Sequence, residues 1–282
     1  MKDSFNKIYQ ESIQNPEKFW QNVSEDIFWF KKPKKILNKY KPPFYKWFED
    51  GVTNTCYNAI DTHIDQGKGD KLALIYDSPI TNKKAKFTYK ELREKISKFA
   101  GALDNQGIKK GDRVIIYMPM IPEAVIAMLA CGRIGAIHSV VFGGFASNEL
   151  ASRIDDSKAK ILITASCGFE PGRTVEYRPL VDGALKLAKH KVEKVIFFQR
   201  KDHEVKLNSP LEISWEESLA NAKDKDCVEI GANEFAYILY TSGTTGIPKG
   251  IVRDVGGHIV ALKWTMKNLS LIHISEPTRP IR

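Results

Sequence analysis

The residues best suited to chemistry lie in one stretch, YTSGTTGIPKG at residues 240–250, directly after an apolar strand candidate at residues 235–240. Its glycines permit turns that expose several backbone N–H groups, and such groups together form a concave anion-binding surface. Hydroxyl donors and one ammonium group add to this surface. We therefore predict a loop that binds a polyphosphate, formed by Thr241, Ser242, Gly243, Thr244, Thr245, Gly246 and Lys249.

This loop differs from a Walker A motif, in which the lysine is followed by serine or threonine. Here Lys249 is followed by Gly250. The alternative interpretation is a flexible Gly/Thr linker, which the position directly after a buried strand and the closing Pro-Lys-Gly disfavour.

Strand and helix candidates alternate from about residue 70, and together they must position the loop. Residues 88–91, Thr-Tyr-Lys-Glu, form a capping box that opens one helix, and residues 214–217 form a second box. The strand candidates are residues 72–76, 114–118, 137–141, 161–164, 195–198 and 235–240. Strands this apolar are buried on both faces with helices as crossovers. The sequence therefore predicts an α/β fold with a doubly wound, mostly parallel sheet and helices on both faces, whose sites lie beyond the carboxyl ends of the strands.

Composition narrows the function classes. The chain has 282 residues, 43% of them hydrophobic, which suits one large or two ordinary globular domains. The net charge of +9 favours anionic partners. Four dispersed cysteines form neither a disulfide framework nor a zinc pattern, and no signal peptide or membrane span is evident, so we expect a cytoplasmic protein without a metal site.

The first sixty residues differ in character from the rest. Asn15 and Pro16 mark a helix start, after which aromatic residues and a lysine run at residues 31–41 follow. A nucleic-acid site would use such lysines for phosphates and aromatics for base stacking. No arginine accompanies the lysines and no nucleic-acid-binding motif is present. We therefore expect a solvated linker whose aromatics dock on the main body, with no nucleic-acid or membrane partner.

The loop at residues 241–250 resembles the phosphate loop of the adenylate-forming (AMP-binding) superfamily. Two further segments are similar to the short-chain acyl-CoA synthetases within it. Residues 45–61 resemble their N-terminal cap segment. Two other short stretches resemble their CoA-nucleotide site, which implies CoA contacts from Phe142, Gly143, Gly144, Glu170, Pro171, Gly172 and Arg173.

Residues 167–173 and 250–258 resemble the propionyl-CoA synthetase branch more than the acetyl-CoA synthetases, which usually carry an arginine in place of Glu170. A carboxylate would repel a nearby phosphate. The alternatives for Glu170 are that it orients Arg173, or that it contacts the ribose or adenine. Arg173 itself suits a phosphate or a ring-stacking role, because its guanidinium is planar and always charged.

The resemblance implies a two-step reaction of a small carboxylic acid with ATP, Mg²⁺ and CoA. The acid attacks the α-phosphorus of ATP, giving an acyl-adenylate and diphosphate, and the CoA thiol then displaces AMP. The alternatives are an acetate-using ligase of the same family and a non-catalytic module that binds a nucleotide or CoA.

The resemblance also implies an incomplete fold. Residues 1–62 correspond to the cap segment and residues 63–268 to a truncated AMP-binding domain. Residues 269–282 look like a translated sequencing adapter rather than family sequence. The family's adenine pocket, acyl pocket and catalytic lysine would follow the phosphate loop, so we expect no catalytic residue here and no activity from this fragment alone.

Overall fold

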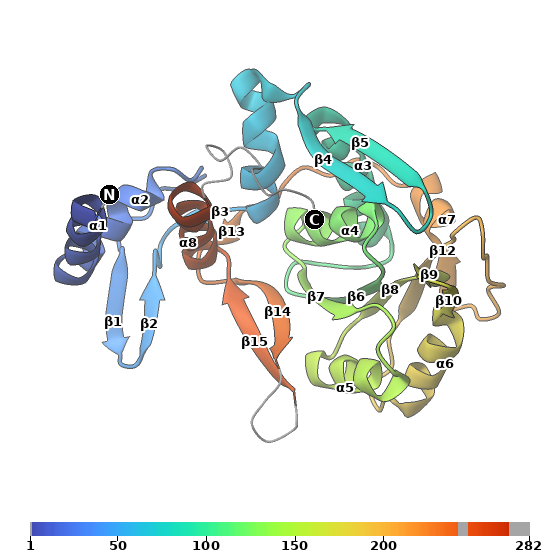
Figure 1. Ribbon diagram of the computed structural model, residues 1–282. Helices are drawn as coiled ribbons and strands as arrows, with labels where there is room; N and C mark the ends of the chain where they lie inside the picture. Colours follow the sequence, from blue (N-terminus) through green and yellow to red (C-terminus); the bar gives the residue numbers. More distant parts are fainter. Residues whose placement is uncertain (1, 242–247, 271–282) are drawn as a thin grey trace. The chain divides into compact units, whose positions relative to one another are not determined.

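The computed structural model describes residues 2–241 and 248–270 (Figure 1). By contacts the chain forms two compact units. The first contains the residues up to Thr53, Glu229–Glu234 and the residues from Asp254 onward. The second contains Asn54–Val228 and Phe235–Arg253. Residues 54–62 thus pack with the second unit, while their expected assignment to the cap segment stays a prediction based on resemblance.

A seven-stranded sheet forms the centre of the second unit. Its strands in chain order are β6 (Arg113–Met118), β7 (Ile137–Phe142), β8 (Ile161–Ala165), β11 (Lys194–Phe198), β12 (Glu212–Ser214), β14 (Phe235–Thr241) and β15 (Lys249–Asp254). They lie in the order β12-β11-β8-β6-β7-β14-β15. Every pairing from β12 to β14 is parallel. The carboxyl ends of these strands therefore meet at one edge, as the sequence predicts.

Helices cover both faces of this sheet. They are α3 (Tyr89–Asn105), α4 (Pro122–Arg133), α5 (Ser147–Ser157), α6 (Tyr177–Leu187) and α7 (Trp215–Ala220). Figure 1 shows α3 and α4 on one face and α5 and α6 on the other. Strands β6 and β8 lie between the layers, and Val114–Tyr117 and Ile161–Ile163 are fully buried. This arrangement confirms the doubly wound α/β fold, because strands covered on both faces need apolar side chains on both sides.

Capping residues set several helix starts. The Thr88 hydroxyl accepts a hydrogen bond from the Glu91 N–H at 3.2 Å, and the Glu91 carboxylate accepts one from the Thr88 N–H at 2.8 Å. This confirms the first capping box. Ser214 accepts only the Glu217 N–H, at 3.0 Å, so the second box is half formed. Helix α2 (Pro16–Ser24) begins where the sequence predicts, directly after Asn15. The sequence also suggests Asn15 as the cap of this helix, and this is wrong, because its side chain makes no cap hydrogen bond.

Two short antiparallel hairpins flank the main sheet of the second unit. They are β4 (Leu72–Ser78) with β5 (Lys83–Thr88), and β9 (Cys167–Glu170) with β10 (Arg173–Glu176). The sequence places the strand at residues 72–76 in the parallel series. In the structure it pairs with β5 instead, and its Leu72 and Ile75 side chains are exposed. A half-exposed strand of this kind suits a hairpin and not the centre of a covered sheet.

The first unit has a core of its own. Its elements are α1 (Lys2–Gln14), α2, β1 (Leu37–Lys41), β2 (Phe44–Trp47), β3 (Val52–Thr53), β13 (Ile230–Gly231) and α8 (Gly256–Thr265). Buried Trp29 and Phe48 pack with Ala232 and Val260, so segments distant in the sequence share one cluster. The stretch that the sequence suggests is a solvated linker is therefore packed structure with a β1–β2 hairpin. In the described ranges, no helix has the length and apolar character required to cross a bilayer.

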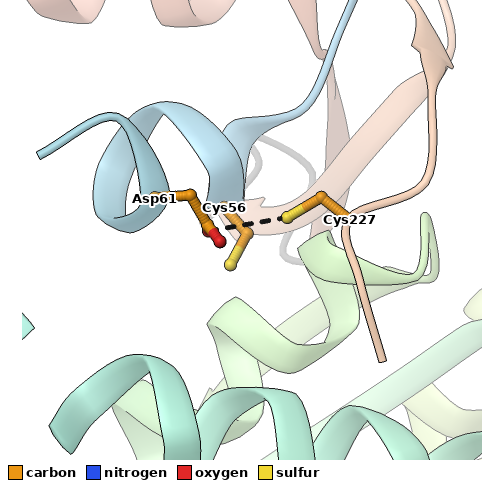
Figure 2. A group of neighbouring side chains, drawn as sticks. All are labelled: Cys56, Asp61 and Cys227. Carbon is orange, nitrogen blue, oxygen red and sulfur yellow. Dashed lines mark hydrogen bonds between the residues drawn. The ribbon is translucent and has the colours of Figure 1, made fainter. Parts of the chain in front are cut away.

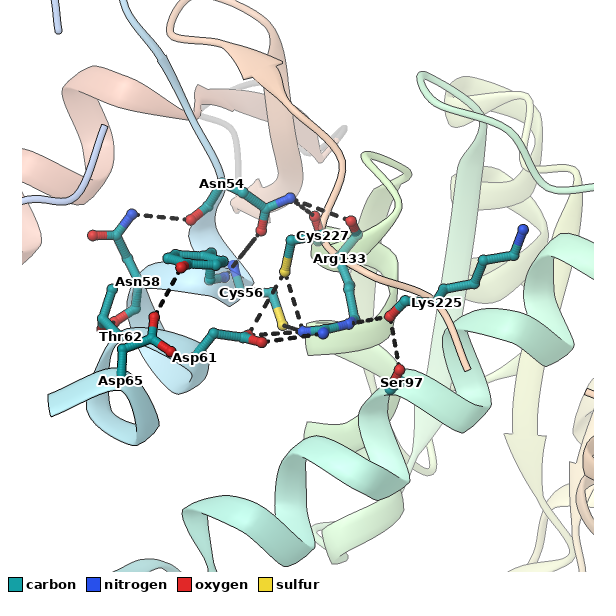
Figure 3. Close-up of polar contacts among 12 residues, drawn as sticks. Asn54, Cys56, Asn58, Asp61, Thr62, Asp65, Ser97, Arg133, Lys225 and Cys227 are labelled. Atoms are coloured by element: carbon teal, nitrogen blue, oxygen red, sulfur yellow. Dashed lines mark hydrogen bonds and ion pairs between the residues drawn. The ribbon is translucent and has the colours of Figure 1, made fainter. Parts of the chain in front are cut away.

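A buried arginine ties the second unit together at the end of α4 (Figure 3). The Arg133 side chain is 3% exposed, and its two terminal nitrogens donate to the Asp61 carboxylate at 2.8 and 3.1 Å. Its Nε donates to the Lys225 carbonyl at 2.6 Å. Asp61 ends the helical segment η1 (Tyr57–Asp61), so one guanidinium joins three stretches that are far apart in the sequence.

Asn54 fixes the same three stretches through the backbone. Its side-chain amide donates to the carbonyls of Gly132, Arg133 and Val228 at 3.0, 3.3 and 2.9 Å. Its side-chain oxygen accepts the N–H of Cys56 at 2.8 Å, at the start of the helical segment. The amide therefore satisfies carbonyls that the end of α4 leaves without helical partners.

We expect Asp61→Asn to lower the free energy of unfolding by about 3–5 kcal/mol, because it leaves the Arg133 charge buried without its partner. The matched control is Asp77→Asn, which breaks an ion pair with Lys84 in which both side chains are more than half exposed. That change should cost at most about 1 kcal/mol. Urea unfolding followed by tryptophan fluorescence measures both, and equal losses would contradict a special role for Asp61.

A partly buried histidine lies on β7, with its Nδ1 atom shielded from solvent. His138 packs against Tyr237 on the neighbouring strand, with ring centroids 5.5 Å apart. Burial lowers the pKa of His138 from 6.5 to about 4. Between these pH values the unfolded chain binds a proton that the folded chain does not. The contribution to stability is therefore complete above pH 6.5 and is lost as the pH falls toward 4.

We expect His138→Asn, which cannot take up this proton, to flatten the fall in stability between pH 6.5 and 4. The difference between the two proteins should change by about 3 kcal/mol at most across this window. Urea unfolding at half-unit pH steps gives both curves. Parallel curves would show that the histidine does not titrate as its burial requires.

Candidate functional site

The glycine pair after β7 occupies a turn that tolerates no side chain. A Cβ added to Gly143 would lie 2.2 Å from the Tyr177 hydroxyl oxygen and 2.8 Å from the Met118 carbonyl oxygen. Gly144 has φ +96°, in the region that glycine adopts at least cost. The Tyr117 hydroxyl accepts the Gly144 N–H at 3.2 Å and donates to the Phe145 carbonyl at 2.7 Å. Two buried tyrosines, Tyr117 and Tyr177, therefore hold this turn in place.

Burial also keeps these tyrosines neutral. It raises the pKa of Tyr117 to about 12, and it raises the pKa of Tyr177 as well. At neutral pH both hydroxyl groups are therefore available for hydrogen bonding without a charge. Phe142, by contrast, is 69% exposed beside the turn, with its ring 5.4 Å from the ring of Phe145.

The second predicted segment forms the tip of the β9–β10 hairpin. Glu170 and Arg173 face each other across the turn, and the Arg173 Nε donates to the Glu170 carboxylate at 2.7 Å. Pro171 and Gly172 are exposed, and Gly172 has φ +75°. The ion pair fits the alternative in which Glu170 orients Arg173. Both side chains are substantially exposed, so the guanidinium remains open to a ligand.

The hairpin borders a groove of about 630 Å³. Arg173 and Glu170 line it on one side, and Lys83 and Asp202, which pair at 2.7 Å, line it on another. Phe169 adds an aromatic face, and the guanidinium of Arg200 lies 4.3 Å from the centre of its ring. The groove therefore offers two cations, each paired with a carboxylate, and one aromatic ring. Guanidinium and ammonium groups can bind phosphate, and an aromatic ring can stack on a planar base.

Sequence reasoning identifies only one side of this groove. Thr81 lies in the β4–β5 turn, Lys83 begins β5, and Asp202 follows β11. The basic run at residues 83–86 is a sequence signal that could have suggested the lysine. Phe169 belongs to β9 of the hairpin itself, directly before Glu170. Asp202 has no sequence signal, because only the tertiary structure brings it to the hairpin.

The predicted phosphate loop connects β14 to β15. Thr241 is the last residue of β14 and Lys249 the first of β15, and both are exposed. The predicted ligands Ser242, Gly243, Thr244, Thr245 and Gly246 lie outside the described residues. The loop therefore leaves the sheet at the carboxyl end of a strand, the position that its anion-binding role requires.

Helix α5 links this loop to the glycine turn. The Tyr240 hydroxyl donates to the Asp156 carboxylate at 2.6 Å, and this contact together with burial raises the pKa of Tyr240. The guanidinium of Arg153 lies 5.3 Å from the ring of Tyr240 and 5.3 Å from the ring of Phe145. Two segments that the sequence predicts separately are thus held at one edge of the sheet by residues that sequence reasoning missed.

Two family models match the chain. A model described as AMP-binding enzyme matches residues 61–275, and a model described as acetyl-coenzyme A synthetase N-terminus matches residues 5–59. The chain belongs to the AMP-binding enzyme family. This confirms the resemblance to the AMP-binding superfamily that the sequence shows. It also agrees with the structure, in which residues 235–254 form a strand, the predicted phosphate loop and a second strand.

Relatives within the AMP-binding family cover most of this chain. The human protein named acyl-CoA synthetase short-chain family member 3, mitochondrial, is 54% identical over 259 residues, which are 92% of this chain and 38% of that protein. Acetyl-coenzyme A synthetase of Xylella fastidiosa is 41% identical over 268 residues, covering 93% of this chain and 41% of its own length. The chain thus spans about two fifths of these relatives.

A solved structure shows the same fold. The acetoacetyl-CoA synthetase from Streptomyces lividans matches with a TM-score of 0.82 at 25% sequence identity, over 91% of this chain and 39% of that one. Nearly all of this AMP-binding protein chain therefore shares its α/β architecture with the matching 39% of the solved synthetase.

We expect Gly143→Ala to lower the free energy of unfolding by about 1–3 kcal/mol, because the added methyl group collides with the Tyr177 hydroxyl and the Met118 backbone. Thr174→Ala, an exposed position on β10, is the control and should change stability by less than about 0.5 kcal/mol. Denaturant unfolding of both variants provides the comparison. A neutral Gly143→Ala would mean that the turn can relax.

Proposed function

We propose that this chain is the N-terminal part of an ATP-dependent short-chain acyl-CoA ligase. Its preferred reaction converts propionate, ATP and CoA to propionyl-CoA, AMP and diphosphate through an acyl-adenylate. The observation that carries the proposal is the 54% identity, over 92% of this chain, to relatives named acyl-CoA synthetase short-chain family member 3. The relative named acetyl-coenzyme A synthetase is less similar, at 41%.

The phosphate loop would hold the β- and γ-phosphates of ATP. The exposed Thr241 hydroxyl and Lys249 ammonium are donors, which suits phosphate oxygens and not a metal ion. Mg²⁺ keeps several of its own waters and would therefore enter with the nucleotide, where it lowers the charge of the departing diphosphate. The loop N–H groups and Lys249 would stabilise the charge that develops in the reaction, which is the main protein contribution to such transfers.

The groove at the β9–β10 hairpin would hold the nucleotide end of CoA. Its volume of about 630 Å³ lies within the usual range for sites of small ligands. Arg173 and Lys83 supply positive charge for a phosphate, and Phe169 supplies an aromatic face. Glu170 orients Arg173 through their ion pair. Phe142, Gly143 and Gly144 form the neighbouring turn, in which Gly144 would let a ligand approach the backbone closely.

Cytoplasmic location stays a prediction from the sequence, and the human relative is named as mitochondrial. The same holds for the expectation that residues 1–282 alone give no turnover. A non-catalytic module that binds ATP or CoA remains the alternative from a different class, and the experiment below separates it from the ligase.

The test begins with sequencing the gene across codon 268 from unfragmented DNA. The protein encoded by that reading frame is then expressed, and its formation of AMP is measured. We expect CoA-dependent AMP release with propionate at a higher kcat/KM than with acetate, and none from residues 1–282 alone. A preference for acetate would select the acetate-using ligase. Binding of ATP or CoA without AMP release by the protein would overturn the ligase proposal.

We expect Arg173→Gln to raise the KM for CoA about tenfold, since the loss of one charged hydrogen bond of about 1.4 kcal/mol has this effect. The KM for ATP should change much less. Lys186→Gln, which removes an exposed charge from α6, is the matched control and should change neither value. An unchanged KM for CoA would remove Arg173 from the proposed nucleotide site.

A further inference from the structure

Two cysteines that are distant in the sequence meet beside the Arg133 ion pair. Cys56 lies just before η1, and Cys227 lies between α7 and β13. Their sulfur atoms and a carboxylate oxygen of Asp61 all lie within 4.8 Å of one another. Figure 2 shows the three side chains gathered at one place. Both cysteines carry free thiols. The sequence spacing shows none of this, because the fold alone brings these residues together.

The guanidinium of Arg133 determines what this cluster can bind. One terminal nitrogen donates to the Cys227 sulfur at 3.1 Å, to the Cys56 sulfur at 3.6 Å and to Asp61 at 2.8 Å (Figure 3). A divalent cation held by all three groups would lie close to this fixed positive charge, and the repulsion in a buried place is strong. The cluster therefore has the character of a thiol pair beside a cation rather than of a metal centre.

We propose that Cys56 and Cys227 form a peroxide-oxidisable dithiol, a modification site that closes as an intramolecular disulfide. Cys227 reacts first, because it is partly exposed whereas Cys56 is fully buried. Its sulfur attacks one peroxide oxygen, giving a sulfenic acid and water. The Cys56 sulfur then attacks the Cys227 sulfur and releases a second water. In total, two thiols and one hydrogen peroxide become one disulfide and two waters, with two electrons transferred to the peroxide.

The contacts around the pair allow this closure. The sulfurs must approach from within 4.8 Å to about 2.05 Å, a change within the reach of side-chain rotation and a small backbone shift. Arg133 would keep both hydrogen bonds to Asp61 and its bond to the Lys225 carbonyl, since none of these involves a sulfur. The disulfide can therefore form without breaking the buried ion pair.

The same contacts make the reaction slow. The hydrogen bond with the Cys56 thiol, burial and the Asp61 charge raise the pKa of Cys227, and the opposing charge of Arg133 offsets this only in part. The thiolate is the reactive form, so peroxide should oxidise Cys227 more slowly than it oxidises free cysteine at the same pH.

The test treats the reduced, purified protein with hydrogen peroxide and maps its thiols by alkylation and peptide mass spectrometry; it requires no ligase activity. We expect a mass loss of two hydrogens, a linked peptide pair containing Cys56 and Cys227, and reversal by a dithiol reductant. Cys131 and Cys167 should remain alkylatable after unfolding. Four free thiols at all peroxide concentrations, or a disulfide through another cysteine, would overturn the proposal.

Variants separate the roles of the two thiols. Cys56→Ser should stop at the sulfenic acid of Cys227, which dimedone traps, and Cys227→Ser should give no disulfide. Cys131→Ser, which removes a buried thiol outside the cluster, is the matched control and should still form the linked pair. Zinc that copurifies in one equivalent and protects both thiols from peroxide would overturn the dithiol in favour of a metal site. If a variant fails to fold, the thiol mapping of the unaltered protein still tests whether Cys56 and Cys227 form the disulfide.

Discussion

The ion pair between Arg133 and Asp61 is the interaction on which the rest of the second unit depends. A guanidinium that is 3% exposed cannot be left without a partner, because the cost of burying an isolated charge is large. The end of α4, the segment η1 and the irregular stretch at residues 225–228 must therefore meet at one place. Asn54 repeats the same constraint with three backbone carbonyls. These contacts hold the chain at Lys225 and Val228, before it continues to β13 and β14.

The candidate site lies at one edge of the main sheet of the second unit. Parallel strands bring their carboxyl ends to one edge, where the turn after β7 and the loop after β14 lie near α5. Arg153 packs against one aromatic ring from each segment, so the two segments that the sequence predicts to bind ligands share a support. The tyrosines beneath Gly143 and Gly144 are buried and neutral, and they hold the turn without adding a charge that would oppose a phosphate. The site thus combines rigid backbone at the sheet edge with exposed cations at the hairpin.

The dithiol lies against the same arginine, which gives Arg133 two roles. It neutralises Asp61, and it donates hydrogen bonds to both sulfurs. The proposed disulfide would therefore form beside a buried ion pair, while the residues that line the groove lie elsewhere in the unit.

Sequence patterns alone predict five of the seven strands of the main sheet, the capping box at Thr88 and the family, because these depend on local periodicity, local hydrogen bonds and short motifs. They also name one side of the groove through Glu170 and Arg173. Contacts between residues that are far apart in the sequence became visible only in the folded chain. They bring Lys83 and Asp202 to the groove beside Arg173, place Arg153 between two aromatic rings and place Cys56 beside Cys227. The structure also shows that the strand at residues 72–76 belongs to a hairpin and that the first unit has its own core. The physical reason is that long-range packing and buried charge choose these partners, and neither leaves a regular spacing in the sequence.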